Sequence, residues 1–400
     1  MNALYLCYQS IADPLTATQV TAYLEGLALA GHRMFLLTFE APPLSAAEQA
    51  RFKRELGALG IEWSWLRYHK HPTFPATLWD TLIGIVHGLR LSRQVRIDLW
   101  HARGYVPGVM ALALQRLRGG KFLFDIRGLM AEEYIDAGVW RENGWLYRLT
   151  KRVERWLLSA ADAVVILTEK GRSWLRERHG QRIQGKPLRV IPCCVDLRGA
   201  ATFAPSAAGS PDIPRIAYVG KLGGWYLAQE MMSFFGAARR VMPALQWEIW
   251  TQSDSTAMRS WLTDADLAGN TSVGQMRQAQ LLPHLRNQCH AALCFIRPCR
   301  SKLASSPTKI GEYLAAGLPV VLNAGIGDLD ALFLKERVGV LLPSLDASEY
   351  EKAAHQLAEL LAEPGLRERC AQVARKNFDL EQIGWPAYGD LYRSLEPAAA

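Results

Sequence analysis

The chain has 400 residues, enough for two or three domains at about 150 residues per domain. Half of the residues are hydrophobic and 21% are charged, which is a globular composition and excludes a disordered or collagen-like chain. No apolar stretch reaches the ~18 residues that a membrane span requires, and residues 1–7 lack the basic flank of a secretory signal. We therefore expect a cytoplasmic protein.

The charge is divided unevenly along the chain. Residues 1–200 hold 27 Lys and Arg against 18 Asp and Glu, whereas residues 201–400 hold 19 against 20. A basic half attracts an anionic partner, which could be a nucleic acid, a phosphorylated substrate or an anionic membrane surface. Arginines that only keep the protein soluble are the plainer interpretation. The basic residues are scattered and no nucleic-acid-binding motif is present, so we expect no nucleic acid partner.

Seven cysteines, an odd number, favour a reducing compartment and free thiols. Cys289, Cys294 and Cys299 recur every five residues, but no histidine follows at zinc-finger spacing. The sequence around them is that of a buried strand. We therefore predict no metal site.

The first half alternates short apolar runs with segments of helical periodicity. The expected strands cover residues 3–8, 33–39, 62–66, 98–101, 121–125, 163–167 and 188–192, with helices such as 18–30 and 107–117 between them. Strands separated by helices of this length predict βαβ units and a parallel sheet. Each strand is nearly continuously apolar, as expected when helices cover both faces of the sheet.

Residues 199–214 interrupt this pattern with a small, proline-rich and nearly uncharged stretch, which predicts a linker. The alternation then resumes with strands expected at 215–219, 246–251, 290–296, 318–322 and 338–341, and with helices at 227–241 and 308–316. The predicted fold is α/β, with two doubly wound, Rossmann-like domains at 1–198 and 215–378 that face each other across a cleft. A C-terminal helix within 379–400 is expected to cross back to the first domain.

The segment 305–321 is the most informative one. Ser-Ser-Pro-Thr is typical of a helix start, and Ala-Ala-Gly-Leu-Pro is typical of a helix end followed by a strand. A helix N-terminus with free amides and two hydroxyls suits a phosphate. Lys309 and Glu312 are three residues apart and share one helix face, where they fit a diphosphate and a ribose. A capped helix with a surface ion pair is the alternative.

This segment resembles the donor-nucleotide motif of the family 4 retaining glycosyltransferases, which have the GT-B architecture. Residues 13–20, 101–104, 124–128, 191–196 and 218–226 resemble the family's other strand ends and loops, in the same order along the chain. The resemblance implies transfer of a sugar, of the hexosyltransferase type, from a nucleoside diphosphate sugar to an acceptor hydroxyl. It also implies retention of configuration, no metal and no other cofactor, and a role in cell-surface glycan or glycolipid biosynthesis. A sugar-nucleotide epimerase of the same fold remains the alternative.

The resemblance and the positions of the residues together predict three sets of site residues. The catalytic set is His101, Lys221, Lys309 and Glu312. The donor-binding set is Gly220, Gly223, Gly224, Lys302, Ser305, Ser306, Thr308, Gly325, Ile326 and Gly327. The acceptor-binding set is Asp13, Thr16, Arg103, Asp125 and Arg127. For His101 the alternative is a core histidine, for Asp125 and Arg127 an internal salt bridge, and for the glycines at 325 and 327 a plain turn.

Two positions depart from the family pattern. The first glutamate of its donor motif is Ala304 here, and the second cation of its first loop in the C-terminal domain is Tyr226. Lys302 and Lys309 are expected to supply the missing positive charge.

Two stretches combine aromatic and basic residues at helical spacing, 76–93 and 140–158. Such stretches fit an interfacial helix, and a core-facing stripe is the alternative. The sequence therefore predicts peripheral contact with an anionic membrane, through Arg148, Lys151, Arg152 and Arg155, and a glycan or lipid-linked acceptor.

Overall fold

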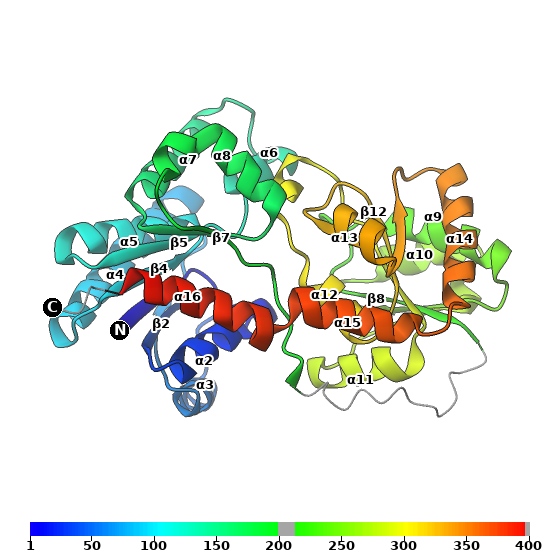
Figure 1. Ribbon diagram of the computed structural model, residues 1–400, viewed down its shortest axis with the longest axis horizontal. Coiled ribbons are helices and arrows are strands. Elements are labelled where there is room, and N and C mark those ends of the chain that lie inside the picture. Colours follow the sequence, from blue (N-terminus) through cyan, green and yellow to red (C-terminus); the bar gives the residue numbers. More distant parts are fainter. Residues whose placement is uncertain (199–212, 397–400) are drawn as a thin grey trace. The chain divides into compact units, whose positions relative to one another are not determined.

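The computed structural model describes residues 1–198 and 213–396 (Figure 1). The chain forms two compact units: unit 1 comprises Met1–Asp196 and the chain from Leu380 onward, and unit 2 comprises Leu197–Asp379. Each unit is an α/β structure built on one parallel sheet, as the sequence predicts. Most of the predicted linker, residues 199–212, lies outside the described residues.

Unit 1 contains a seven-stranded sheet in the order β3-β2-β1-β4-β5-β6-β7. Its strands are β1 (Asn2–Cys7), β2 (Arg33–Glu40), β3 (Ile61–Arg67), β4 (Leu99–Arg103), β5 (Lys121–Asp125), β6 (Ala163–Ile166) and β7 (Leu188–Val190). The seven strands predicted from the apolar runs are therefore all present. Strand order reverses between β1 and β4, and this is the point at which ligands bind in open parallel sheets.

The helices of unit 1 lie in two layers. α1 (Pro14–Thr16), the π-helix η1 (Ala17–Thr21), α2 (Ala22–Leu29) and α3 (Ala46–Ala58) connect the first three strands. α4 (Thr73–Gln94), α5 (Tyr105–Arg118), α6 (Met130–Asp136), α7 (Trp145–Ala160) and α8 (Glu169–Ile183) follow. α4 packs on α5, α5 on α7 and α7 on α8, whereas α2 packs on α16 (Trp385–Leu395).

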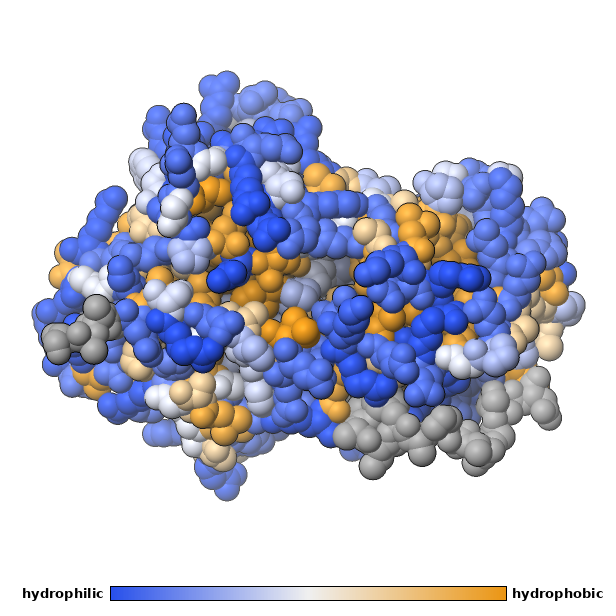
Figure 2. All heavy atoms as spheres, viewed as in Figure 1, coloured by the Kyte–Doolittle hydropathy of each residue, from blue (hydrophilic) through white to orange (hydrophobic). Residues whose placement is uncertain are grey.

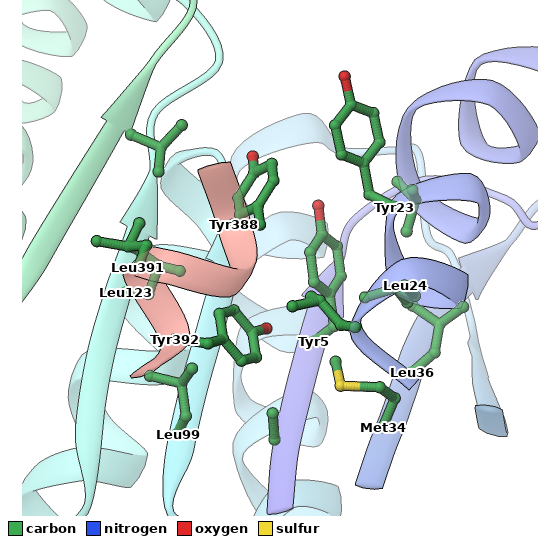
Figure 3. Close-up of a cluster of buried hydrophobic side chains, with 14 of the residues drawn as sticks. Tyr5, Tyr23, Leu24, Met34, Leu36, Leu99, Leu123, Tyr388, Leu391 and Tyr392 are labelled. Carbon is green, nitrogen blue, oxygen red and sulfur yellow. The ribbon is translucent and has the colours of Figure 1, made fainter. Parts of the chain in front are cut away.

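The C-terminal helix α16 is part of the core of unit 1. Figure 3 shows Tyr388 and Tyr392 projecting from this helix toward Tyr5 of β1 and the apolar side chains around it. Trp385 of the same helix donates its indole N–H to the carbonyl of Ala22 at 2.8 Å. Its ring occupies the space beside Gly26, where a Cβ would lie 2.2 Å from it. α16 thus covers strands of unit 1 that are far from it in the sequence: 291 positions separate Tyr392 from His101 of β4.

Unit 2 contains a six-stranded sheet in the order β10-β9-β8-β11-β12-β13, with its reversal between β8 and β11. The strands are β8 (Arg215–Val219), β9 (Gln246–Trp250), β10 (Thr271–Gly274), β11 (Ala291–Cys294), β12 (Val320–Asn323) and β13 (Gly339–Leu342). β10 was not predicted from the sequence. It is a four-residue edge strand with no fully buried residue, so its composition lacks the apolar run that marks the others.

The helices of unit 2 are α9 (Ala228–Val241), α10 (Thr256–Asp264), α11 (Gln278–Gln288), α12 (Thr308–Ala315), α13 (Leu329–Glu336), α14 (Ala347–Leu361) and α15 (Leu366–Phe378). Unit 2 also contains the 3₁₀ turns η3 (Ala268–Asn270) and η4 (Arg300–Ala304). The π-helix η5 (Leu380–Gly384) follows α15 and belongs to unit 1. α14 packs on α9, and α15 packs on α12.

The face drawn in Figure 2 is mostly hydrophilic, with apolar side chains gathered in separate patches. Within the described residues, no helix combines the length and the apolar character needed to cross a membrane.

The packing of α16 predicts the effect of two substitutions. The hydroxyl of Tyr392 lies 2.8 Å from Nδ1 of buried His101. Tyr392→Phe removes this hydrogen bond and is expected to lower the free energy of unfolding of unit 1 by about 1–2 kcal/mol. Tyr392→Ala is expected to lower it by about 3–5 kcal/mol, because it also opens a cavity. Urea denaturation followed by circular dichroism measures both. Tyr134→Phe, at a side chain that is 41% exposed, is the control, and an equal loss in it would contradict the argument.

Candidate functional site

The candidate site of unit 2 lies where its strand order reverses. The loop after β8 spans residues 220–227, and the chain after β11 leads through η4 into α12. Tyr226 and Ile296 form an isolated antiparallel bridge, so the loop after β8 is attached to the segment that follows β11. These segments bring together most of the residues that the sequence assigns to the donor.

The loop after β8 approaches α12 too closely for a side chain. Gly220 has φ 138°, and a Cβ at this position would lie 2.5 Å from Nζ of Lys309. Gly223 and Gly224 also have positive φ values, of 80° and 66°. Glycine is the residue that adopts such angles without strain and lets backbone pass directly over another group. Gly220 therefore brings the backbone of the loop over Lys309, and Gly223 and Gly224 let the loop turn.

The ammonium group of Lys309 is buried and has no hydrogen-bond partner among the described residues. It lies 3.5 Å from the ring centroid of Tyr226 and 4.7 Å from that of Tyr218. Burial lowers the pKa of Lys309, while the neighbouring Cys294 and Glu312 act in the opposite direction. The side chain is thus a buried cation that touches aromatic faces and lacks an anionic contact.

Lys302 stacks in the same way on Trp225, the residue that precedes Tyr226 in the loop after β8. It belongs to η4, its side chain is only 5% exposed, and its Nζ lies 3.9 Å from the ring centroid of Trp225. Two lysines from adjacent segments therefore stack on two consecutive aromatic residues. Position 226 is the one at which the family resemblance predicts a cation, and the structure places the ammonium of Lys309 on the face of the tyrosine that stands there.

The energies indicate that Lys309 is not placed there for stability alone. A desolvated cation–π contact contributes about 2 kcal/mol. Removing an ammonium group from water costs several kcal/mol. The two aromatic rings do not offset that cost, whereas an anionic ligand that accepts hydrogen bonds from Nζ would. The buried ammonium of Lys309 is therefore chemically suited to an anionic ligand.

The start of α12 differs from the prediction. The N-cap residue is Pro307, no side chain caps the helix, and the first helical residue is Thr308. The predicted hydroxyl cap is wrong, because Pro307, whose side chain has no acceptor, occupies the N-cap position and the two serines precede it. Ser305, Ser306 and Thr308 are all half-buried. Their hydroxyls lie around the helix start without capping it.

Glu312 and Lys221 are the two remaining residues of unit 2 in the predicted catalytic set. Glu312 is half-buried and stands one turn after Lys309 on α12. Lys221 is exposed, and its backbone carbonyl accepts a hydrogen bond from the hydroxyl of Tyr218. Lys221 is therefore an exposed charge, whereas the ammonium of Lys309 is buried.

In the glycine loop after β12, two backbone N–H groups already donate hydrogen bonds within the protein. The N–H of Gly325 donates to the Asp330 carboxylate at 3.0 Å, and the N–H of Gly327 donates to the Lys302 carbonyl at 2.8 Å. Ile326 is buried. The expectation that these amides approach a ligand is not met by the two glycines, because their N–H groups already have acceptors. The loop instead holds η4, and with it Lys302, in place.

In unit 1, four of the residues at the reversal of strand order are joined by hydrogen bonds. The Gln19 side chain accepts from Arg127 at 3.1 Å, and the Gln19 carbonyl accepts from Arg103 at 3.2 Å. Arg127 also contacts the sulfur of Cys193 at 3.3 Å. It has φ 57°, a left-handed angle that costs energy for a residue with a side chain. Gln19 was missed as a site residue, although it lies in the 13–20 stretch that the resemblance identifies.

His101 does not lie at the strand end where the sequence placed it, and Asp125, which is the last residue of β5, is buried there. His101 is the third residue of the five-residue β4 and is 1% exposed, and Asp125 is fully buried. Tyr388 donates to Asp125 at 2.9 Å, and Tyr392 contacts His101 at 2.8 Å. The expectation that both face a ligand is wrong in this respect, because α16 returns to cover them. They are positioned to hold α16 and Arg127, whose guanidinium lies 3.7 Å from Asp125.

Asp13 and Thr16 flank the start of the first helical segment. Asp13 is exposed and accepts a hydrogen bond from the N–H of Leu15 at 2.8 Å. Thr16 is fully buried, and its hydroxyl has no partner among the described residues. Asp13 is thus accessible to a ligand, whereas Thr16 is not.

One group of side chains in the described part of the chain has a composition that suits a metal. Glu248, His284 and Cys289 offer ligand atoms within 4.8 Å of one another. The carboxylate of Glu248 is 2.6 Å from His284 and 3.5 Å from Arg215. The Glu248 carboxylate thus already contacts the ring of His284 and the guanidinium of Arg215, so these residues form an internal polar cluster.

Unit 1 is similar to a known protein family. Residues 16–194 match the family of glycosyl transferase 4-like domains. This match covers most of the first segment of unit 1 and a little under half of the chain. A comparison with curated protein sequences gives no match.

Solved glycosyltransferase structures share the fold of this chain. Sucrose-phosphate synthase from Thermosynechococcus elongatus matches with a TM-score of 0.71 at 17% identity, covering 99% of each chain. A glycosyltransferase from Rickettsia africae matches with a TM-score of 0.72 at 12% identity, covering 100% of this chain and 99% of that chain. HepE from Anabaena, solved in complex with UDP, matches with a TM-score of 0.69 at 14% identity, covering 98% of this chain and 100% of HepE.

The burial of His101 predicts a pH dependence of stability. Burial holds the pKa of His101 well below its usual value, and Arg103 and Arg127 lower it further. The folded protein thus keeps the imidazole neutral, whereas the unfolded chain takes up a proton below pH ~6.5. Stability from this residue is therefore present above pH ~6.5 and is lost as the pH falls, by up to about 1.4 kcal/mol per pH unit.

The variant His101→Asn tests this dependence, because it lacks the titrating ring. The difference in the free energy of unfolding between wild type and variant, measured by urea denaturation from pH 7.5 to 5.5, should shrink steadily below pH 6.5. A difference that stays constant over this range would contradict the assignment.

Proposed function

We propose that this glycosyltransferase moves a sugar from a nucleoside diphosphate sugar to a hydroxyl of a glycan or lipid-linked acceptor, with retention of configuration and without a metal ion. The observation that carries the proposal is the buried, unpartnered ammonium of Lys309 beneath the Gly220 backbone. A diphosphate is the anion that this position suits, because it lies where strand order reverses. HepE, which shares the fold, was solved in complex with UDP.

Lysine side chains balance the negative charge that develops on the leaving diphosphate in this proposal. Lys309 and Lys302 are fixed by the aromatic rings beneath them, so their ammonium groups need not reorganise when the glycosidic bond breaks. Exposed Lys221 adds a third cation that closes over the phosphates from the loop. Glu312, on the same helix face as Lys309, accepts the ribose hydroxyls. This arrangement supports chemistry that needs no divalent cation.

Unit 1 is proposed to bind the acceptor. Arg103 and Arg127 remain partly exposed at the carboxyl end of β4 and β5, and Gln19 fixes both of them. Guanidinium groups donate hydrogen bonds that suit the hydroxyls and negatively charged groups of a glycan. The proposed place of action is the cytoplasmic face of a membrane that carries a lipid-linked acceptor, in cell-surface glycan or glycolipid biosynthesis. The anomeric configuration of the product, read by proton NMR, tests retention.

The first prediction on the donor concerns Lys309. Lys309→Ala is expected to weaken binding of UDP by tenfold or more and binding of uridine by less than twofold, because only UDP has phosphates to lose. Isothermal titration calorimetry measures both. Lys335→Ala is the matched control, since Lys335 is 74% exposed in the same unit. Equal losses for UDP and uridine would contradict the phosphate role.

A rescue variant sharpens this test. In Lys309→Met/Tyr226→Lys, an ammonium group from the loop occupies the position that Nζ of Lys309 holds 3.5 Å from the Tyr226 ring. UDP binding should recover in part. A double variant that melts at the wild-type temperature and still binds UDP no better than Lys309→Ala would show that charge at this point is not what matters.

Glu312→Ala is expected to abolish transfer while the thermal melting temperature stays within a few degrees of wild type, because the side chain is half-buried on the helix surface. Transfer is measured as release of nucleoside diphosphate in the presence of acceptor. Wild-type turnover in the folded variant would remove Glu312 from the site.

Chelation tests the absence of a metal. The sequence has two Asp-x-Asp triplets, at 264–266 and 328–330, but Asp330 already accepts a hydrogen bond from the N–H of Gly325, and three side chains of the proposed site carry positive charge. Transfer should survive EDTA unchanged. Complete loss of activity that Mg²⁺ or Mn²⁺ restores would overturn the metal-independent proposal.

A further inference from the structure

Helix α4 of unit 1 exposes an unusual amount of apolar surface. Five of the fourteen large hydrophobic side chains that are exposed among the described residues belong to this helix: Phe74, Leu78, Trp79, Leu82 and Val86. Their exposed fractions lie between 45% and 56%. Exposed apolar residues are normal when they are scattered singly, whereas a contiguous group on one element marks an interaction surface.

The spacing of these residues places them on one face of the helix. Phe74, Leu78, Leu82 and Val86 are each four residues apart, so they line up along the helix axis. We call this face, with Trp79 beside it, the α4 stripe. The stripe is about 18 Å long at 1.5 Å per residue.

The opposite face of α4 is fixed to unit 1. A Cβ at Gly84 would lie 2.7 Å from the sulfur of Met110, and one at Gly88 would lie 2.6 Å from Leu114. Both partners belong to α5. Because the helix is packed this closely, the α4 stripe cannot turn inward, and it faces away from the core.

Helix α7 extends the stripe. Its first residue, Trp145, is 64% exposed, and its ring lies 5.7 Å from that of Phe74. Trp156 of the same helix is 54% exposed. The amino-terminal ends of the two helices therefore meet, and their exposed aromatic residues continue one another.

The exposed charges of the two helices all have the same sign. α4 and α7 contain one acidic residue each, and both are buried: Asp80 is bound by Tyr8 at 2.7 Å and Glu154 by Tyr105 at 2.6 Å. The exposed charged residues are Arg90, Arg93, Arg148 and Arg152. In the loop before α7, exposed Arg141 and Glu142 offset each other.

Lys151, which the sequence predicted as a lipid contact, is not available for one. Its ammonium lies 3.0 Å from Glu132 and also binds Glu154, and its side chain is 13% exposed. Glu132 is itself buried, and burial raises its pKa. Lys151 thus belongs to an internal ionic cluster, and the surface charge of α7 comes from its arginines.

We propose that the α4 stripe and Trp145 insert into the headgroup region of an anionic bilayer, with the exposed arginines of α4 and α7 contacting lipid phosphates. Aromatic and aliphatic side chains on one helix face, flanked only by positive charge, are the combination that an interfacial helix requires. A protein partner would need no such uniform charge. The inference rests on the proposed membrane-linked acceptor for its purpose, but docking itself requires no sugar donor.

Vesicle cosedimentation tests the proposal. The full chain is mixed with vesicles of phosphatidylcholine alone or with 30% phosphatidylglycerol, at low and high salt. Wild type should bind the anionic vesicles at low salt at least tenfold more tightly than the neutral ones. The double variant Trp79→Gln/Leu82→Gln should lose at least tenfold in affinity at both salt concentrations, because it removes inserted surface.

Two matched variants separate the contributions. Arg90→Gln/Arg93→Gln should lose about tenfold at low salt and almost nothing at high salt, because surface charge is screened. Leu334→Gln, at a residue of unit 2 that is 72% exposed, should bind as wild type does.

The outcomes distinguish this inference from the proposed donor site. Every α4 variant should bind UDP as wild type does, and Lys309→Ala should bind vesicles as wild type does. Wild-type vesicle binding by Trp79→Gln/Leu82→Gln overturns the inference, as does a wild-type protein that binds no vesicle. A dimer in light scattering that dissociates in the same variant also overturns it, since the stripe would then be covered by a second copy.

Discussion

The candidate donor site depends on one buried charge. The ammonium of Lys309 lies beneath the Gly220 backbone and on the ring of Tyr226, and it has no hydrogen-bond acceptor among the described residues. Several features of unit 2 follow from accommodating it. Position 220 favours glycine, because its φ of 138° is strained for other residues and a Cβ would displace Nζ of Lys309. Position 226 offers a ring face that tolerates a cation. Burial also lowers the pKa of Lys309, so an anion that binds there both repays the desolvation cost and favours the protonated form.

Unit 1 depends on a different constraint, the return of the chain from Leu380 to its first strands. α16 covers the face of the sheet on which His101 and Asp125 lie, and two tyrosines of that helix bind them. The polar residues that remain accessible lie two positions after His101 and Asp125 in the sequence. Arg103 and Arg127 stand at the end of their strands, where Gln19 holds both.

The sequence predicts the architecture well, because apolar runs and their spacing are local properties. The strands of unit 1, the parallel order and the loop of positive-φ glycines after β8 all follow from local composition. β10 could not be predicted in this way, since a short edge strand buries too little to leave an apolar run. The burial of His101 could not be predicted either, because it depends on Tyr392, 291 positions away. The sequence indicated that Lys309 would supply the cation missing at position 226, but it did not show that its ammonium would stack on that tyrosine.

A crystal structure of the protein with UDP is the most direct test of the account. We predict a β-phosphate oxygen within hydrogen-bonding distance of Nζ of Lys309, and Glu312 in contact with the ribose hydroxyls. A complex in which the diphosphate binds away from Lys309, leaving its ammonium buried between the tyrosines without an acceptor, would contradict it.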